Sequence, residues 1–283
     1  MDLRLKNEIK NLVKKYNLLP KKSLGQNFLI SQQILKKIIK ASSIQKNDIV
    51  LEVGPGLGTL TKELSQKAKK VIAIEKDEKM FEILREELRD YKNVEFIQRD
   101  ILKIKIDELK LKSKKYKITA NLPYYIATPV LRKFLELKNH PNSMILMVQK
   151  QVAQRICAKP PNMNLLAVFV QFYAQTKIIG FVSKKSFFPE PKVDGAIIRI
   201  NPNNKFPSII GKLENLFFEI VKIGFSKPRK QILNIFFNSS LFKKQSKENI
   251  EKWLLKNKIN PKQRAESLTI NNWIDLSKTY QNI

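Results

Sequence analysis

The sequence predicts an α/β domain with a largely parallel sheet, followed by a smaller domain built from helices. Two features predict it. Between Asp48 and about residue 158, short apolar runs alternate with segments of helical length, and such alternation is typical of parallel strands joined by right-handed crossover helices. Near the C-terminus, apolar residues instead recur at helical spacing. We therefore expect one domain over residues 1–203 and an all-α domain over residues 204–283.

The N-terminal part is expected to contribute two helices separated by a polar turn. A basic helix is expected over residues 3–15. A glycine and two amides, Gly25–Asn27, precede a second helix over residues 31–41, for which Ser31 is a good N-cap. By itself the turn fits an ordinary helix start as well as it fits a binding loop.

The first strand of the sheet, expected over residues 48–53, ends in a glycine-rich turn. Three glycines at alternate positions (Gly54–Gly58) follow it and lead into a helix expected over residues 59–68. Such a turn lets the backbone approach a ligand closely, with amide donors pointing outward. Thr59 occupies the position of the third glycine in the dinucleotide-binding pattern, so the turn favours a single nucleoside.

An acidic residue follows this turn at a nucleotide-binding spacing. The next strand, expected over residues 70–75, ends in Glu75, 21 residues after Gly54. In nucleotide-binding βαβ units, an acidic residue about twenty residues after the glycines binds a ribose hydroxyl. Glu75 is therefore predicted to bind a ribose from an exposed strand end.

Polar residues also follow the later strands. Strands are expected over residues 94–98, 117–121 and 143–149, and helices over residues 77–90, 126–138 and 150–158. Ligands of parallel sheets bind beyond the carboxyl ends of the strands. Asp100 and Asn121 lie at such ends, so we expect them to converge with the glycine turn on one rim.

The pattern changes after residue 160. Residues 165–183 and 193–200 are predicted to be β-rich and to form an antiparallel pair at the edge of the sheet. Residues 201–208 predict a linker, because they combine two prolines with asparagines. Helices are then expected from about Leu213 and near residues 229–239, 247–257 and 270–279.

The net charge of +29 indicates a polyanionic partner such as nucleic acid. The alternative is a compositional bias of the source genome, because the excess charge is spread evenly along the chain. With one cysteine (Cys157) and one histidine (His140), a disulfide framework is excluded, and a zinc site or a Ser-His-Asp triad is disfavoured. No apolar run approaches the ~20 residues of a membrane span, and the N-terminus lacks a signal-peptide core. We expect a cytoplasmic protein without a metal.

A short segment at the end of the fourth expected strand predicts chemistry on adenine. The exocyclic amine of adenine is a poor nucleophile, because its lone pair is delocalised into the ring. The Asn121 side-chain oxygen and the Leu122 carbonyl can accept from the amine and localise that lone pair. Pro123 stiffens the turn. Tyr124 offers a face for base stacking, worth about 1–3 kcal/mol, and Phe187 could close the other side. The alternative is a polar turn stopped by proline.

These residues belong to a wider set of motifs. The motifs are Leu24–Leu29, Glu52–Gly58, Asn121–Tyr125, Met147–Lys150, Phe187–Asp194, Phe225–Lys230 and Pro261–Leu268. With them the chain, from about Lys21 to its end, resembles the ribosomal RNA small-subunit methyltransferase A family of rRNA adenine N6-dimethyltransferases. The motifs before residue 200 are shared with Erm-type enzymes, which methylate large-subunit rRNA, whereas the last two are not typical of those.

The resemblance implies a Rossmann-like class I S-adenosylmethionine-dependent methyltransferase sheet in residues 1–203 and an RNA-recognition role for residues 204–283. It implies S-adenosyl-L-methionine as the methyl donor. The implied targets are the N6 amines of two adjacent adenosines near the 3′ end of small-subunit (16S) rRNA, methylated to N6,N6-dimethyladenosine during 30S biogenesis. The implied partner is the immature 30S subunit, bound by a monomer.

The resemblance also assigns the site residues. Glu75 would hold the ribose hydroxyls of the donor, and Asp100 its adenine amine. The implied donor pocket consists of Asn27, Leu29, Gly54, Gly56, Glu75, Asp100 and Asn121. The implied catalytic residues, around the target base, are Asn121, Leu122, Pro123, Tyr124 and Phe187.

Three departures from the family pattern stand out. Pro228 replaces a usual arginine, Arg99 replaces a common glycine, and the segment around Asn162–Leu165 is shortened. The first and third affect the expected RNA-facing surface. The alternatives are an Erm-type 23S rRNA adenine methyltransferase, which the C-terminal motifs disfavour, and a non-catalytic ribosome assembly factor, which has no need of a donor pocket.

Overall fold

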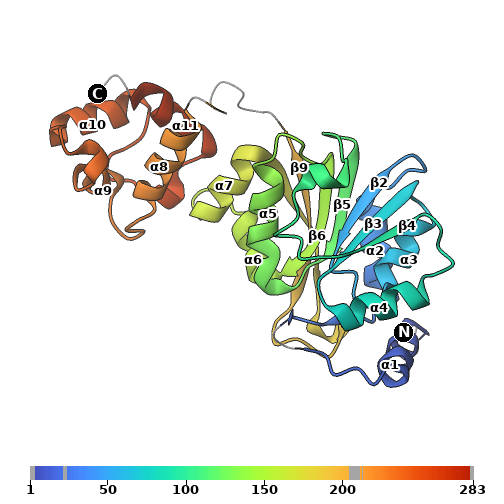
Figure 1. Ribbon diagram of the computed structural model, residues 1–283. Helices are drawn as coiled ribbons and strands as arrows, with labels where there is room; N and C mark the ends of the chain where they lie inside the picture. Colours follow the sequence, from blue (N-terminus) through green and yellow to red (C-terminus); the bar gives the residue numbers. More distant parts are fainter. Residues whose placement is uncertain (1–3, 22–23, 204–210, 212, 281–283) are drawn as a thin grey trace. The chain divides into compact units, whose positions relative to one another are not determined.

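The computed structural model describes residues 4–21, 24–203, 211 and 213–280. Its contacts divide the chain into two compact units (Figure 1). Unit 1 consists of Met1–Ala153 and Thr176–Pro202, and unit 2 consists of Gln154–Gln175 and Asn203–Ile283. These packing units place residues 154–175 with the C-terminal helices, whereas the predicted domain boundary lies at residue 203. No helix in the described part of the chain is long and apolar enough to cross a membrane.

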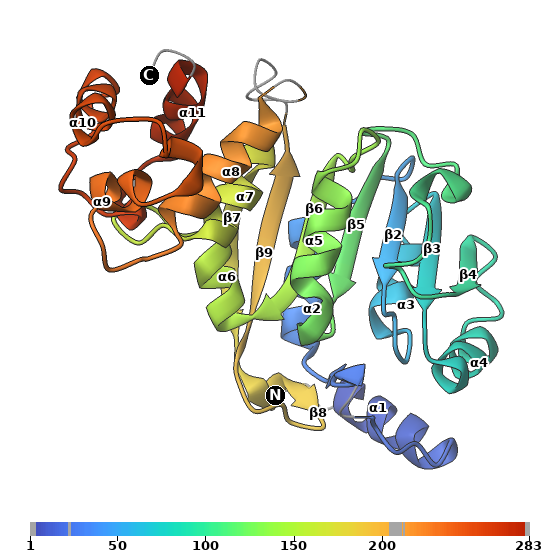
Figure 2. The ribbon, with the colours of Figure 1, turned by 60° about the vertical axis from the view of Figure 1, so that its left-hand side comes forward.

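Unit 1 is built on a seven-stranded sheet (Figure 2). The strand order is β4-β3-β2-β5-β6-β9-β7. The strands are β2 (Ile49–Val53), β3 (Lys70–Glu75), β4 (Val94–Gln98), β5 (Tyr116–Asn121), β6 (Ser143–Gln149), β7 (Ala174–Val182) and β9 (Gly195–Pro202). The pairs from β4 to β6 are parallel, and β9 is antiparallel to β6. The five predicted parallel strands are confirmed to within one residue at each end.

Helices cover this sheet on both faces. They are α2 (Gln32–Ser42), α3 (Thr59–Ser65), α4 (Glu78–Glu87), α5 (Ala127–Leu135) and α6 (Lys150–Ile156), whereas α1 (Arg4–Lys15) lies beyond the ends of the strands. Figure 2 shows α5 on one face of the sheet and α2 with α3 on the other. The predicted N-cap of α2 is confirmed, because the Ser31 side chain accepts from Ile34 N. Asp77 caps α4 in the same way by accepting from Met80 N.

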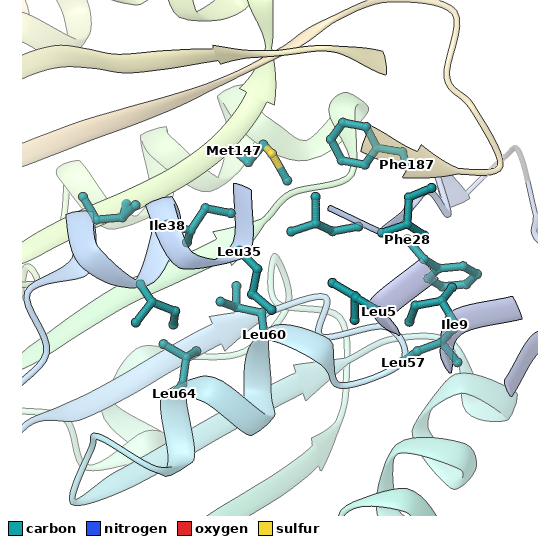
Figure 3. Close-up of a cluster of buried hydrophobic side chains, with 14 of the residues drawn as sticks. Leu5, Ile9, Phe28, Leu35, Ile38, Leu57, Leu60, Leu64, Met147 and Phe187 are labelled. Atoms are coloured by element: carbon teal, nitrogen blue, oxygen red, sulfur yellow. The ribbon is translucent and has the colours of Figure 1, made fainter. Parts of the chain in front are cut away.

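A two-stranded ladder joins segments far apart in the chain. Strand β1 (Phe28–Leu29) pairs antiparallel with β8 (Phe187–Phe188), with Phe28 opposite Phe188 and Leu29 opposite Phe187. Phe28 and Phe187 belong to a buried apolar cluster that also holds side chains of α1, α2 and α3 (Figure 3). The ladder therefore brings the Leu24–Leu29 motif to the Phe187–Asp194 motif.

The expectation that residues 165–183 are β-rich is wrong in its first half. Helix α7 (Leu165–Tyr173) precedes β7. Because this segment is apolar almost throughout, its periodicity does not distinguish strand from helix. Asn164 starts the helix, since its side chain accepts from Ala167 N at 3.1 Å. Packing within unit 2 stabilises it, with the Phe172 and Phe217 rings stacked at 4.5 Å.

Unit 2 is helical, as expected. Besides α7 it contains α8 (Glu214–Gly224), α9 (Ile232–Phe237), α10 (Lys247–Lys256) and α11 (Ile270–Thr279). Aromatic rings fill its interior, where Phe242 stacks on Phe236 and contacts Trp253. Most of the predicted linker, residues 204–208, lies outside the described residues, and β9 extends to Pro202.

An acidic side chain is deeply buried within the sheet of unit 1. Glu52, on the interior strand β2, is 1% exposed, and no hydrogen-bond partner for its Oε2 atom lies among the described residues. Burial, together with the nearby Glu75 carboxylate, raises the pKa of Glu52 to about 8. The raised pKa makes folding favour the protonated acid, so its contribution to stability is lost as pH rises from the ordinary value towards 8.

We expect Glu52→Gln to become more stable relative to the parent between pH 5.5 and pH 7.5. Each pH unit in that window contributes about 1.4 kcal/mol, so the relative gain should reach up to about 3 kcal/mol. Urea unfolding followed by circular dichroism at both pH values measures the gain. Glu95→Gln removes the same charge from a half-exposed side chain of the same sheet and serves as the control. An equal pH dependence in the two variants would contradict the shifted ionisation of Glu52.

Candidate active site

A cavity lies at the carboxyl ends of the parallel strands of unit 1. All the sequence-predicted site residues line it. They are Asn27, Leu29, Gly54, Gly56, Glu75, Asp100, Asn121, Leu122, Pro123, Tyr124 and Phe187. Parallel register explains the convergence, because Val53 lies opposite Ile74 and Gly54 N donates to Ile74 O at 2.9 Å. The residues that follow each strand therefore meet at the same rim.

The glycine turn holds the backbone close to its neighbours. Gly56 has φ +57°, in the left-handed region, and a Cβ atom there would lie 3.4 Å from the Phe28 ring. Gly25 has φ +61°, and its Cβ would lie 3.3 Å from Pro123 Cβ. Gly25 therefore lets the N-terminal turn approach the segment that ends β5.

Glu75 is more buried than its position at a strand end predicted. Its side chain is 8% exposed, so the expectation of an exposed residue is wrong. Glu75 Oε1 accepts from Lys76 N and from Asp77 N at 2.8 Å each, and Oε2 accepts from Gly56 N at 3.4 Å. The glycine turn and the start of α4 thus enclose the carboxylate. Burial raises the pKa of Glu75, and these three backbone donors oppose the shift.

Asp100 lies in the same cavity but is already paired. Its Oδ2 atom lies 2.9 Å from Lys76 Nζ, and its Oδ1 accepts from Leu102 N at 2.9 Å. Burial opposes ionisation, but the Lys76 ammonium and the Leu102 amide lower the pKa of Asp100. Asp100 is therefore an ionised acceptor, and a donor group that reaches it must share its oxygens with Lys76.

Asn121 is oriented by the N-terminal turn. Its Nδ2 atom donates to Asn27 O at 3.3 Å, and Asn27 Nδ2 donates to Gly25 O at 3.0 Å. Because the amide nitrogen is used in this way, the Asn121 Oδ1 atom is the part of the side chain that can accept from a ligand. Two motifs almost a hundred residues apart thus orient one hydrogen-bond acceptor, the Asn121 Oδ1 atom.

The segment after Asn121 forms a fixed turn with one aromatic wall. Leu122 is buried, and its amide donates to Met147 O at 3.1 Å. Ile126 N donates to Pro123 O at 3.1 Å, which closes the turn. Tyr124 is half-buried and lines the cavity, with its Oη atom buried and without a hydrogen-bond partner among the described residues. Burial and the nearby Asp194 carboxylate raise its pKa to about 12, so the phenol is neutral.

Phe187 offers less surface than its assigned role requires. It lines the cavity, but only 3% of it is exposed, because it packs in the apolar cluster of Figure 3. Tyr124 therefore provides the larger aromatic surface, and Phe187 offers only a small part of its ring.

The cavity also contains residues for which the sequence predicted no role. Glu52, Lys76 and Asp77 line it, and Lys21 Nζ lies 2.6 Å from Asp77 Oδ2. Asp77 lies two residues after Glu75, at the N-cap of α4. Aspartate is a preferred N-cap residue, so the sequence contained a signal for its position at the start of this helix. The Lys76–Asp100 pair joins two strand ends, and sequence spacing does not predict such a contact.

This set of side chains fits a cationic nucleoside. The buried Glu75 side chain lies at the glycine turn beside Glu52, whose pKa of about 8 leaves it a neutral acid at neutral pH, and Glu52 Oε2 has no hydrogen-bond partner in the described part of the chain. Carboxylate oxygens match hydroxyl donors and a positive charge. The apolar wall from Leu29 and Phe28 suits a planar or aliphatic group.

Comparison with known proteins gives the same picture over nearly the whole chain. A model of the ribosomal RNA adenine dimethylase family matches residues 17–282. A protein of Clostridium botulinum (strain Langeland) named ribosomal RNA small subunit methyltransferase A is 42% identical over 270 residues, covering 95% of this chain and 96% of the relative. A protein of the same name from Dehalococcoides mccartyi is 40% identical over 274 residues, covering 96% of this chain and 92% of the relative.

Solved structures share the fold. A dimethyladenosine transferase from Plasmodium falciparum aligns with a TM-score of 0.74 and 28% identity, over 90% of this chain and 98% of that one. The 23S rRNA methyltransferase ErmE aligns with a TM-score of 0.72, over 89% and 98%, but its 22% identity shows the fold alone. The predicted class I methyltransferase fold is confirmed. The chain belongs to the ribosomal RNA adenine dimethylase family, whose members are S-adenosylmethionine-dependent methyltransferases.

Proposed function

We propose that the protein transfers methyl groups from S-adenosyl-L-methionine to the N6 amines of two adjacent adenosines near the 3′ end of small-subunit rRNA. The orientation of Asn121 carries the proposal, because its amide nitrogen bonds to Asn27 O and leaves Oδ1 as an acceptor at the rim of the cavity. The name shared by the relatives supports the small subunit as the target. The resemblance of the motifs supports the pair of adenosines. The proposed partner is the immature 30S subunit, bound by a cytoplasmic monomer with residues 204–283 recognising RNA.

We assign donor binding to the buried half of the cavity. Glu75 would accept from the ribose hydroxyls, since among the described residues its Oε2 atom has a single, long hydrogen bond, from Gly56 N. Asp100 would accept from the adenine amine of the donor while it keeps its pair with Lys76. Asn27, Leu29, Gly54 and Gly56 would form the remaining wall of this pocket, with Asn121 at its rim.

The target amine is proposed to meet Asn121 and Leu122. The Asn121 Oδ1 atom and the Leu122 carbonyl would accept the two amine hydrogens and make the nitrogen lone pair available. Tyr124 would stack on the base, Pro123 would hold the turn, and Phe187 would border the base with the small part of its ring that lines the cavity. The donor supplies an electrophilic methyl group on a sulfonium, so the chain contributes position and acceptors rather than a strong base.

The alternatives are less well supported. The 23S rRNA methyltransferase ErmE is only 22% identical to this chain, against 42% for the small-subunit relative. A non-catalytic assembly factor would have no need of a buried Glu75 held by three backbone donors, nor of an Asn121 oriented by a second motif.

Glu75→Gln should weaken the binding of S-adenosylmethionine roughly 10- to 100-fold, since a charged acceptor is worth about 1.5–3 kcal/mol. Glutamine keeps one oxygen for the backbone donors, whereas Glu75→Ala would leave all three unpaired and reduce stability as well. Isothermal titration measures the affinity. Glu82→Gln, at an exposed position of α4, is the matched control. Equal affinities for parent and Glu75→Gln would refute the ribose assignment.

Asn121→Ala should slow methyl transfer roughly 30- to 1000-fold, if the lost acceptor is worth about 2–4 kcal/mol in the transition state. Donor binding should change little. Single-turnover methylation of immature small subunits with saturating donor measures the rate, and nucleotide mapping identifies the product. A near-parental rate would mean that Asn121 is not the amine acceptor.

Two variants separate this effect from general damage. Asn142→Ala removes an exposed amide just before β6, at the opposite end of the sheet, and should react at the parental rate. Tyr124→Phe keeps the stacking face and removes a buried hydroxyl that has no hydrogen-bond partner in the described part of the chain. Tyr124→Phe should therefore change the methylation rate little, whereas Tyr124→Ala, which removes the stacking face, should lower it strongly.

RNA binding should depend steeply on salt, because a protein with net charge +29 releases counterions when it neutralises phosphates. Each neutralised phosphate contributes about 0.7–0.9 to the slope of log affinity against log salt concentration. Titration of immature small subunits between 50 and ~200 mM salt should show at least a tenfold loss of affinity. A flat response would instead support compositional bias as the origin of the charge.

A further inference from the structure

A second hollow in unit 1 lies at the carboxyl end of β6 and carries a strong positive charge. Most of its side chains come from the motifs Met147–Lys150 and Phe187–Asp194, in residues for which no role has been given so far. The charged and amide residues that line it are Gln149, Lys150, Gln151, Lys184, Lys192 and Asp194. Three ammonium groups thus face one carboxylate.

Hydrogen bonds hold the backbone around this hollow. Gln149 lies opposite Gly195 in the β6–β9 ladder, and Lys150 N donates to Asp194 O at 2.9 Å. Asp194 Oδ1 accepts from Lys184 N at 3.0 Å. The one carboxylate of the hollow is therefore engaged in holding the backbone, and the side chains of Lys150 and Lys184 extend from anchored positions.

Two of the three lysines have charges that are available to a ligand. Lys184 Nζ lies 3.1 Å from Glu190, so its charge is partly neutralised. Lys150 Nζ lies 5.3 Å from the centre of the exposed Phe181 ring. Lys192 is exposed. Across the described residues, no carboxylate lies within ion-pair distance of Lys150 or Lys192.

Tyr124 connects this hollow to the active-site cavity. Its ring lines that cavity. Its Oη atom lies 3.7 Å from the position that a Cβ atom on Gly195 would take, next to Asp194. Tyr124 thus reaches from the cavity to Gly195, whose chain neighbour Asp194 and ladder partner Gln149 line the hollow.

We infer that this hollow, with Lys150 and Lys192 as its principal ligands, binds a backbone phosphate of the RNA beside the adenosine that is methylated. The inference rests on the proposed function. A base that stacks on Tyr124 would extend its ribose and phosphates out of the cavity, and the same side chain reaches Gly195, beside the hollow. Ammonium groups and amide nitrogens are the donors that bind phosphate oxygens.

The chain offers a matched hollow elsewhere in the same unit. Lys36, Lys40, Lys67 and Glu63 line it, between α2 and α3. It also has three lysines and one carboxylate, but it lies near the ends of α2 and α3, which precede the amino ends of β2 and β3. A base in the active-site cavity cannot extend its phosphates to that end of the sheet.

The test compares two double variants, Lys150→Gln with Lys192→Gln and Lys36→Gln with Lys40→Gln. Each removes two positive charges. Equilibrium binding to immature small subunits is measured over a salt series, together with titration of S-adenosylmethionine and single-turnover methylation. The Lys150/Lys192 variant should bind at least fivefold more weakly than the control. Its salt slope should be lower than that of the control by about 0.7–0.9 if both lysines share one phosphate. Donor affinity should stay parental in both variants.

Equal RNA affinities and salt slopes in the two double variants would overturn the phosphate site. That result would leave the proposed function intact as long as the parent methylates adenosine. If the parent transfers no methyl group, the proposed function fails, and the binding comparison still decides whether the hollow contacts RNA. A loss of donor affinity in the Lys150/Lys192 variant alone would count against the inference. It would mean that these lysines bind the donor or that the donor pocket needs them in order to fold.

Discussion

The proposed donor cavity depends on one interaction, the hydrogen bonds of backbone amides to the buried Glu75 carboxylate. Two of its donors, Lys76 N and Asp77 N, belong to the turn after β3, and the third, Gly56 N, belongs to the turn after β2. One side chain therefore joins the loops of two neighbouring strands. Removing the carboxylate would leave three amides unpaired in a water-poor site, at about 1–3 kcal/mol each. Gly56 itself has φ +57°, a backbone conformation that favours glycine, and a Cβ atom there would lie 3.4 Å from the Phe28 ring.

The net charge of this protein is positive, but the acidic side chains that line the cavity are buried or mostly buried. The net charge is +29, yet Glu52 and Glu75 are buried and Asp100 is mostly buried, and all three line the cavity. A positive surface attracts RNA from a distance, whereas ionised carboxylates inside the cavity act only at contact range, on the positive charge of the donor that we propose to bind there. Under this proposal, the long-range field and the local field serve two ligands of opposite charge. The ion pair of Lys76 with Asp100 joins an exposed positive side chain to an acidic side chain of the cavity.

Much of the fold and of the site could be predicted from local sequence patterns. The strands from β2 to β6, each five to seven residues long, follow from short apolar segments bounded by turn signals. Once those strands are parallel, Gly54, Glu75, Asp100 and Asn121 must meet at one rim, and they do. Helix α7 could not be predicted in the same way, because nearly every residue of Leu165–Tyr173 is apolar. Packing against Phe217 within unit 2, together with the Asn164 cap, decides its conformation.

By itself, the sequence determined the order of the strands along the chain, the glycine turn and the residue types at the strand ends, because these depend on neighbours a few positions apart. Only the tertiary structure decided that Glu75 is buried, that Lys76 pairs with Asp100, and that Asn27 orients Asn121. Those features depend on distances between segments that are remote in the chain. Such distances follow from how the helices and loops close over the sheet, and no local period or spacing encodes them.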